Sequence, residues 1–231
     1  MEIRHLAFTE GAAEATGIAV IIDVFRAFST ACYLYDRGAV RVLVTGDIGR
    51  AFAYRRDHPG TLLVGERQEK KVEGFDHGNS PSAVRQDDRI QGSEVVLTTS
   101  AGTKGLVNAR KADRVLAASF VNASATASLL LREKPAVVSL VAMGYNAVTP
   151  ADEDILCAGY IHRLLEGRKP VFDAMEQQIR RGTGARFFDP HNLNSPEEDY
   201  HLCLMPGRFS FALEAVPTGA EGLLLLKKIN V

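Results

Sequence analysis

The sequence predicts an α/β fold with a largely parallel sheet covered by helices. Through the first two thirds of the chain, short apolar runs rich in β-branched residues alternate with longer segments of helical spacing. The run Ile18–Val24 (IAVIIDV) is almost wholly apolar, as expected of a strand buried on both faces. A hydrophobic content of 46% and a charged content of 24% lie in the globular range. We expect a single α/β domain over residues 1–231.

Strands and helices can be assigned in order along the chain. The helix after the first strand ends at Gly38, and the next is stopped by Pro59-Gly60, because glycine and proline end helices. Acidic residues within Ser195–Glu198 are typical of a helix start. The expected strands are Ile18–Val24, Val40–Thr45, Thr61–Val64, Glu94–Thr99, Arg114–Ala118, Ala136–Ala142 and Phe209–Val216. The expected helices are Phe28–Arg37, Ile48–His58, Thr103–Lys111, Asn122–Arg132, Ala151–Glu166 and Phe172–Arg181.

Two segments break this alternation. Glu66–Arg89 is polar and glycine-rich, and it is too long for a tight turn. Gly182–Pro196 is a second irregular stretch, between a charged helix and the C-terminal segment. Long loops inside compact domains are usually functional or disordered. The first segment is therefore a candidate part of a functional site.

Charge and cysteine content exclude several classes of function. Lys and Arg number 27 against 28 Asp and Glu, so the chain lacks the basic excess of a nucleic-acid surface. The separated cysteines Cys32, Cys157 and Cys203 form no CxxC pair, which fits a reducing compartment and no zinc cluster. The N-terminus lacks the apolar core of a signal peptide, and no apolar run approaches the roughly 20 residues of a membrane span. We expect a cytoplasmic protein without nucleic-acid or membrane partners; a homo-oligomer is compatible with the sequence.

Polar residues follow nearly every predicted strand. Asp23 and Arg26 follow the first strand, and Glu66 and Arg67 follow the strand Thr61–Val64. The strand that begins at Glu94 runs into a hydroxyl- and glycine-rich turn at a helix start. Ligands of open parallel sheets bind beyond the carboxyl ends of the strands. We therefore expect these side chains to meet at one sheet edge.

These residue types suit a phosphate-bearing ligand and a divalent cation. Asp23 can bind Mg²⁺ or attack phosphorus, and the planar fork of Arg26 matches phosphate or sulfonate oxygens. The N–H groups of the helix start at Ser100–Thr103 favour an anion. Glu66 and the cluster Asp152–Asp154 add hard oxygen ligands.

Each cluster also has a structural interpretation. Asp23 can cap a turn or helix, and Arg26 can pair with a surface carboxylate. Acidic residues in a helix's first turn are common, so capping by Asp152–Asp154 is favoured over metal binding. The hydroxyls of Thr98–Ser100 can also serve only as caps.

The most specific stretch is Gly65–Pro81 (GERQEKKVEGFDHGNSP). The chain has no GxxxxGK[ST], no GxGxxG after the first strand and no GxSxG. The stretch instead resembles the GER…GFD-GNSP signature of 2-phosphosulfolactate phosphatases. Ile22–Thr30 (IDVFRAFST), Leu97–Thr103 (LTTSAGT) and Ala151–Gly159 (ADEDILCAG) resemble three further segments of that family in the same order. The resemblance covers most of the chain.

The resemblance implies a three-layer α/β/α fold and a defined activity. The family hydrolyses 2-phospho-3-sulfolactate to sulfolactate and phosphate with Mg²⁺, a step toward coenzyme M, so the expected partner is a small anionic phosphoester. The strand-end positions and the resemblance together give Asp23, Arg26 and Glu66 as candidate catalytic residues. The candidate substrate-binding residues are Arg67, Asn79, Ser80, Thr99, Ser100, Gly102 and Thr103. The candidate Mg²⁺ ligands are Asp23, Glu66, Asp76, Glu153 and Asp154.

Two departures from the family pattern bear on the substrate. Ala101 stands where the family's segment usually has asparagine, which removes an amide, and Gln68–Lys71 is more charged than the family version. A phosphatase of another small phosphorylated hydroxy acid is therefore one alternative. A non-catalytic binder of an anionic metabolite is another.

Overall fold

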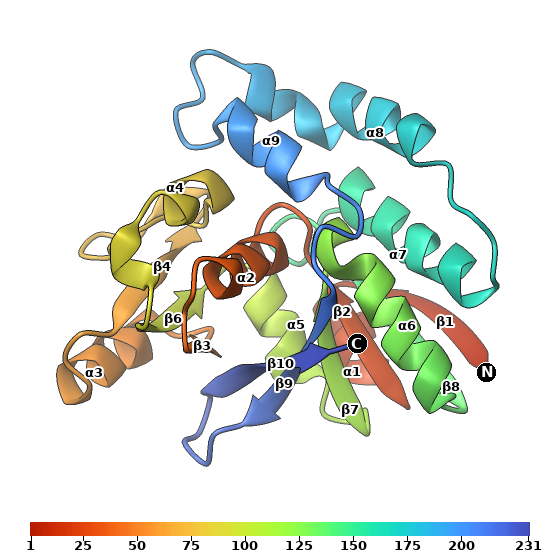
Figure 1. The fold of residues 1–231 in the computed structure, drawn as a ribbon, viewed down its shortest axis with the longest axis horizontal. Coiled ribbons are helices and arrows are strands. Elements are labelled where there is room, and N and C mark those ends of the chain that lie inside the picture. The colour runs from red at the N-terminus through yellow and green to blue at the C-terminus, as the bar shows by residue number, and fades with distance from the viewer.

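A ten-stranded sheet runs through the centre of the molecule, and the computed structural model describes residues 1–231 (Figure 1). Its strand order is β1-β8-β2-β7-β9-β10-β3-β6-β4-β5. The strands are β1 Glu2–Ala7, β2 Ile18–Ile22, β3 Arg41–Val44, β4 Leu62–Arg67, β5 Lys70–Lys71, β6 Glu94–Thr98, β7 Arg114–Ala118, β8 Val137–Ala142, β9 Phe211–Pro217 and β10 Leu224–Asn230. The α-helices are α1 Phe8–Glu14, α2 Ala27–Asp36, α3 Ile48–Asp57, α4 Pro81–Arg85, α5 Gly102–Asn108, α6 Ala123–Glu133, α7 Asp152–Leu165, α8 Phe172–Arg181 and α9 Glu197–Cys203.

The sheet consists of two parallel blocks joined by an antiparallel hairpin. One block is β1-β8-β2-β7 and the other is β3-β6-β4, each with parallel pairing throughout. The hairpin β9–β10 lies between them and pairs antiparallel with β7 and with β3. The blocks lie on opposite sides of α2 and α5 in Figure 1. The predicted α/β fold with a largely parallel sheet is confirmed.

The strand directions correct one expectation of the sequence analysis. Three successive antiparallel pairings separate β7 from β3, so the second block runs opposite to the first along the sheet. The β10–β3 pairing is short, limited to Leu224–Val44 and Leu225–Leu43, and twist accumulates across such a sheet. The polar strand ends do not share one straight edge. Asp23 from the first block and Glu66 from the second meet instead at one cavity between the blocks.

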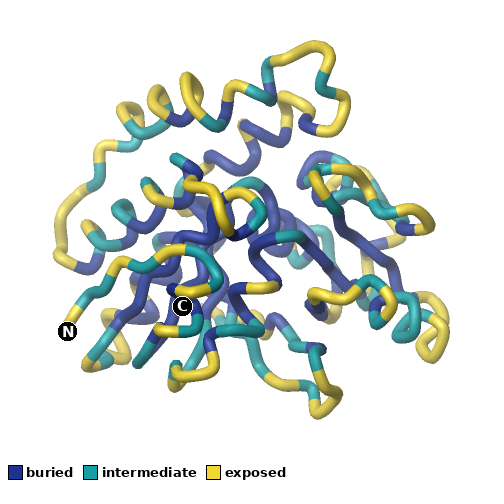
Figure 2. Tube along the Cα trace, turned by 180° about the vertical axis from the view of Figure 1, so that it is seen from behind, coloured by how far each residue is buried: buried dark blue, intermediate teal, exposed yellow.

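Alternating side chains of β2 explain how helices cover both faces of the sheet. Ile21 packs in the cluster that contains Phe28 of α2 and Leu106 of α5. Its neighbours Val20 and Ile22 belong to a second cluster with side chains of α6, α7 and α9. Successive residues of a strand point to opposite faces, so one apolar run serves two layers of helices. Central strands such as β2 and β6 are accordingly almost wholly buried, and buried segments form the interior of the trace in Figure 2.

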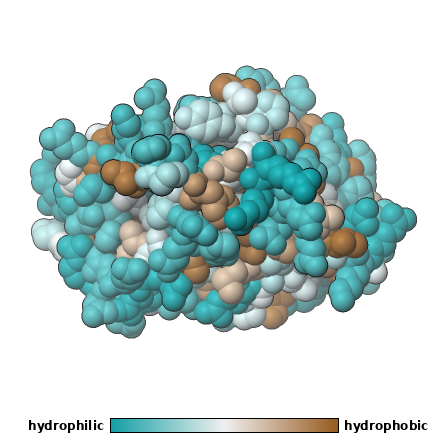
Figure 3. All heavy atoms as spheres, turned by 90° about the horizontal axis from the view of Figure 1, so that it is seen from above, coloured by the Kyte–Doolittle hydropathy of each residue, from teal (hydrophilic) through white to brown (hydrophobic).

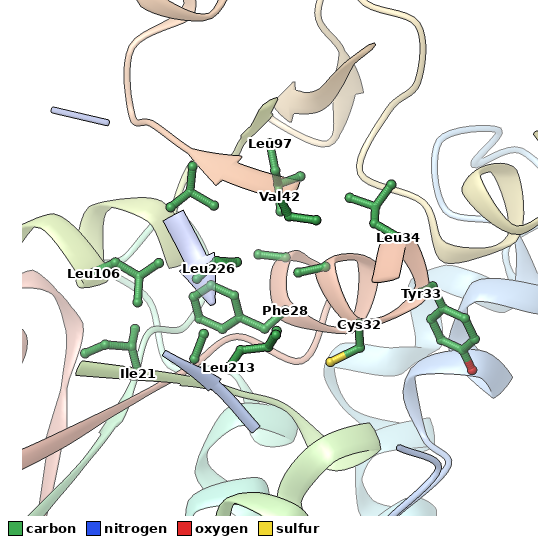
Figure 4. Close-up of a cluster of buried hydrophobic side chains, with 14 of the residues drawn as sticks. Ile21, Phe28, Cys32, Tyr33, Leu34, Val42, Leu97, Leu106, Leu213 and Leu226 are labelled. Atoms are coloured by element: carbon green, nitrogen blue, oxygen red, sulfur yellow. The ribbon is translucent and has the colours of Figure 1, made fainter. Parts of the chain in front are cut away.

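Phe28 holds the two blocks together. Figure 4 shows its ring among Ile21 from the first block and Leu213 and Leu226 from the hairpin, while Leu97 of the second block lies above α2 in the same cluster. Burying these side chains contributes about 1.5–3 kcal/mol each by area. The packing of α2 therefore fixes the relative position of the strand ends that carry the site.

Every predicted strand and helix has a counterpart in the structure, with bounds that differ by a few residues. The strand β1 was not predicted, because its sequence EIRHLA mixes charged and apolar residues at the edge of the sheet. The short helix α1 that follows it was not predicted either. Nor was β10, whose two lysines are exposed. The segment Glu66–Arg89 is not irregular throughout. It contains β5, α4 and the 3₁₀ helix Asp88–Ile90.

The cysteines, the helices and one face of the surface bear on the class of protein. All three cysteines are free and buried. None of the helices has the length and apolar character needed to cross a membrane. The face above α8 and α9 is mostly hydrophilic, with its hydrophobic residues in small separate groups (Figure 3).

Candidate active site

Two adjoining cavities lie where the ends of the two blocks meet. The inner one has a volume of about 40 Å³, and the outer one about 340 Å³. They share the lining residues Phe25, Glu69, Gly144, Tyr145 and Arg186. The predicted residues at the inner cavity are Asp23, Arg26, Glu66, Asn79 and Ser100. The predicted residues at the outer cavity are Glu153 and Asp154.

Asp23 joins the two blocks. It follows β2, its side chain is 5% exposed, and its Oδ1 accepts the amide of Ala27 at 3.0 Å. Its Oδ2 accepts the amide of Gly102, at the start of α5, at 2.8 Å. The pKa of Asp23 is raised to about 7; burial is the largest cause, the nearby charges of Glu66 and Glu153 act in the same direction, and the two amides act against them.

Gly102 is required by the close approach of α5 to this carboxylate. A Cβ atom at this position would lie 2.8 Å from Oδ2 of Asp23 and 3.0 Å from Cβ of Ala27 and Cζ of Phe28. Such contacts cannot form without displacing the α2 segment. The glycine in LTTSAGT therefore permits the bond between the two blocks.

Glu66 holds the other side of the inner cavity. Its Oε1 accepts the amide of Ser100 at 2.7 Å, and its Oε2 accepts the amide of Glu69 at 2.9 Å and Oγ of Ser100 at 3.1 Å. Gln68 and Glu69 both have positive φ, which makes the tight turn between β4 and β5 and brings the Glu69 amide back to Glu66. The side chain is 6% exposed and stays aligned toward the cavity.

Arg26 lines the inner cavity from the start of α2. Its Nη1 donates to Oδ2 of Asp199 at 2.6 Å, and its Nη2 donates to the carbonyl of Asn194 at 2.9 Å. It is 6% exposed, so its expected alternative as a surface ion pair is wrong. The arginine pairs with a carboxylate that is itself fully buried.

Asn79 brings an unsatisfied polar atom to the inner cavity. Its side chain is 5% exposed, and its Oδ1 has no hydrogen-bond partner in the protein. A buried polar atom without a partner is costly and calls for a ligand, a water or an ion. It is the one orphaned acceptor among the residues that line this cavity.

The acidic start of α7 lies at the outer cavity. Asp154 accepts the amides of Val24 and Gly144, each at 2.8 Å, and Glu153 accepts the hydroxyl of Thr183. Burial raises the pKa of both carboxyls, and for Asp154 the neighbouring charges of Glu153 and Asp23 act in the same direction. Asp154 thus holds the loops after β2 and β8, and Glu153 bonds to the 3₁₀ helix Thr183–Phe188; the N-cap residue of α7 itself has no side-chain cap.

Several predicted residues lie outside both cavities. Arg67 donates to the carbonyls of Glu66 and Gly46 and to Oγ1 of Thr98, and burial lowers its pKa. Asp76 accepts the amide of Leu63. Ser80 caps α4, while Thr99 and Thr103 bond to each other.

The expected anion site at the start of α5 stays a prediction, and its amide donors have acceptors within the protein. The amides of Ser100, Gly102 and Thr103 already donate to Glu66, Asp23 and Thr99, respectively. Two of these acceptors are buried carboxylates and the third is a threonine hydroxyl. The side chains that line the cavity are the further candidates for anion binding.

Sequence reasoning missed two charged residues of the site. Arg186, in the 3₁₀ helix Thr183–Phe188, lines both cavities, with its Nε 3.0 Å from Glu69 and its Nη2 3.9 Å from Glu153. Asp199 bonds to Arg26. The only sequence signal was the irregular character of Gly182–Pro196 and the acidic helix start that follows it.

Comparison with known proteins identifies the family. The family model described as 2-phosphosulpholactate phosphatase matches residues 6–183. A probable 2-phosphosulfolactate phosphatase of Caldicellulosiruptor saccharolyticus is 39% identical over 159 residues, 67% of this chain and 65% of that protein. A protein of the same name from Thermotoga petrophila is 36% identical over 221 residues, which are 91% of this chain and 92% of that protein. Another from Bacillus subtilis is 30% identical over 190 residues, which are 80% of this chain and 81% of that protein. The match thus spans slightly less than two thirds of the Caldicellulosiruptor protein and nearly all of the Thermotoga protein. With the family model and these relatives in agreement over most of its length, the chain belongs to the 2-phosphosulfolactate phosphatase family.

Proposed function

We propose that this protein hydrolyses 2-phosphosulfolactate to sulfolactate and inorganic phosphate, as its relatives' name states. The observation that carries the proposal is the convergence of Asp23, Glu66 and Arg26 on one small buried cavity. Water adds to phosphorus, the bond from phosphorus to the substrate oxygen breaks, and that oxygen takes up a proton. The role in coenzyme M formation rests on the family resemblance.

Arg26 and the outer cavity supply complementary parts of the substrate site. The guanidinium of Arg26 suits the phosphoryl oxygens at the inner cavity. The inner cavity, at about 40 Å³, is much smaller than the outer cavity, at about 340 Å³, so we place the carboxylate and sulfonate of the substrate toward the outer one. Arg186, between the two, is the nearest positive charge for that end.

The oxygen-rich lining of the inner cavity fits Mg²⁺. Asp23, Glu66 and Asn79 would hold it, because the orphaned Oδ1 of Asn79 and the two crowded carboxylates all lack a positive partner there. Mg²⁺ in proteins commonly takes one or two carboxylates plus water and phosphate oxygens. When bound, Mg²⁺ neutralises charge that develops on the phosphoryl oxygens.

Asp23 and Glu66 are held rigidly for this task. Each carboxylate oxygen of Asp23 accepts a single amide, which leaves a lone pair on each for a further interaction. Glu66 is fixed in the same way by Ser100 and Glu69. Donors that set a carboxylate's orientation in advance reduce the reorganisation needed during reaction.

Ala101 favours a second candidate substrate. It lines the inner cavity and offers only a methyl group where the family usually places an amide. A phosphorylated hydroxy acid without the sulfonate is therefore the alternative. Phosphate release from 2-phosphosulfolactate, 2-phospholactate and phosphoglycolate, measured with purified protein and Mg²⁺, tests the two. A higher kcat/KM for 2-phosphosulfolactate supports the first substrate, and binding of all three without phosphate release would indicate a non-catalytic binder.

A further inference from the structure

Asp199 is the centre of a buried network that joins the C-terminal segment to the inner cavity. Its side chain is fully buried. Its Oδ2 accepts Nη1 of Arg26 at 2.6 Å, and its Oδ1 accepts Oγ of Ser80 at 3.0 Å and the amide of Ser82 at 2.8 Å. One carboxylate thus connects α9, the start of α4 and the start of α2.

The same segment fixes a second edge of the Arg26 guanidinium. Nη2 of Arg26 donates to the carbonyl of Asn194 at 2.9 Å, and the ring of Phe187 lies 5.8 Å from the guanidinium carbon. The side-chain hydrogen bonds of Arg26 are made by Nη1 and Nη2 and none by Nε, and the residue lines the inner cavity. Arg26 is therefore held in place while part of its donor set stays free.

Without Asp199, Arg26 would face two other acids. Asp23 and Glu66 line the same inner cavity, and an unpaired buried arginine is strongly attracted to such carboxylates. Pairing with either would withdraw the guanidinium from an incoming phosphoryl group. It would also occupy the carboxylates that the proposed reaction requires.

We infer that Asp199 is a positioning residue that holds Arg26 with its free N–H groups toward the phosphoryl oxygens and away from Asp23 and Glu66. The inference rests on the proposed phosphatase function. It also gives the segment after residue 183, where the family match ends, a direct part in the active site.

The test is a double-mutant comparison of Asp199→Asn and Arg26→Met in the full chain with Mg²⁺. Asp199→Asn removes the charge and keeps the shape, so kcat is expected to fall by about 10- to 100-fold, the loss typical of a misplaced catalytic group. In the Arg26→Met background, the same change is expected to alter kcat by less than about twofold, because Asp199 then has nothing to position. An equal loss in both backgrounds would show a merely structural role and overturn the inference.

Glu198→Gln is the matched control. Glu198 lies beside Asp199 on α9, carries the same kind of charge and is half exposed, with only a 3.7 Å contact to Arg85. The kcat of Glu198→Gln is expected to stay within about twofold of the kcat of the unchanged protein. Equal losses in Glu198→Gln and Asp199→Asn would also overturn the inference. Thermal unfolding of each variant, measured on the same preparation, shows that the variant is folded before its kcat is compared.

Binding of inorganic phosphate separates this inference from the proposed function. Calorimetry with phosphate requires no turnover, so it remains informative if the unchanged protein hydrolyses no phosphoester and the proposed function fails. Asp199→Asn is expected to weaken phosphate binding about tenfold, toward the affinity of Arg26→Met. Unchanged or tighter phosphate binding by Asp199→Asn would contradict the positioning role.

Discussion

The amide of Gly102 donates to Oδ2 of Asp23 at 2.8 Å. This bond joins the start of α5, which follows β6 of one parallel block, to the residue that follows β2 of the other. The site is thus built across the gap between two blocks of strands. Its geometry depends on the packing of α2 that keeps the blocks in place.

Replacing Asp23 by asparagine is expected to remove phosphatase activity, by about 1000-fold or more, with little change in stability. The variant loses the negative charge that the proposed reaction needs. Two effects on stability oppose each other, since relief of a buried charge is offset by an amide NH₂ that faces a backbone N–H. Phosphate release and thermal unfolding of the same preparation check both points. Near-normal turnover would refute the role of Asp23.

Replacing Gly102 by alanine is expected to lower both stability and activity. The added Cβ would lie within 3.0 Å of Asp23, Ala27 and Phe28, and overpacking of this kind costs about 1–3 kcal/mol. The control is Gly159→Ala in α7, where a Cβ meets nothing within 4 Å and a small gain in stability is expected. Chemical denaturation measures both variants. Equal stabilities would show that the close approach at Gly102 is unimportant.

The stability of the metal-free protein is expected to fall as pH rises from about 4 to about 7. The pKa of Asp23 is raised from 3.8 to about 7, so the folded state binds more protons than the unfolded state across this interval. In Asp23→Asn the fall should be smaller. Tm is measured at several pH values for both proteins. The difference between them gives the contribution of Asp23 to the pH dependence, separate from that of groups such as His5, whose lowered pKa acts in the opposite direction. An identical pH dependence in the two proteins would be the contrary result.

Replacing Asn79 by alanine is expected to weaken Mg²⁺ binding about tenfold. The variant removes the orphaned Oδ1 from the inner cavity and leaves the carboxylates in place. Asn108→Ala is the control, because Asn108 lies at the end of α5 and bonds to the carbonyl of Lys104. Calorimetric titration with MgCl₂ measures both. If the two variants bind Mg²⁺ equally well, Asn79 is not a ligand.

The order of strands and helices could be predicted because each block alternates apolar runs with helical periodicity. The sheet's reversal could not, because it depends on β10, whose sequence LLLKKIN has exposed lysines and weak alternation. The rule that polar residues gather beyond strand ends predicted Asp23, Glu66 and Ser100 at one place, although they meet across two blocks rather than along one edge.

Asp199, the charged partner of Arg26, could not be predicted from the sequence for a different reason. Asp199 meets Arg26 across 173 positions of the chain, and no local pattern encodes such a contact. Arg67 and Asp76 stand in the family's most specific segment, yet their side chains satisfy backbone groups next to β4. A motif identifies a segment, but packing decides which of its side chains face the cavity.

The most direct test of the account is phosphate release from 2-phosphosulfolactate by the unchanged protein, with Mg²⁺ and then with excess EDTA. We expect turnover with Mg²⁺, its loss in EDTA and its recovery when Mg²⁺ is restored. Absence of phosphate release under all three conditions, from protein shown to be folded, would contradict the proposed function.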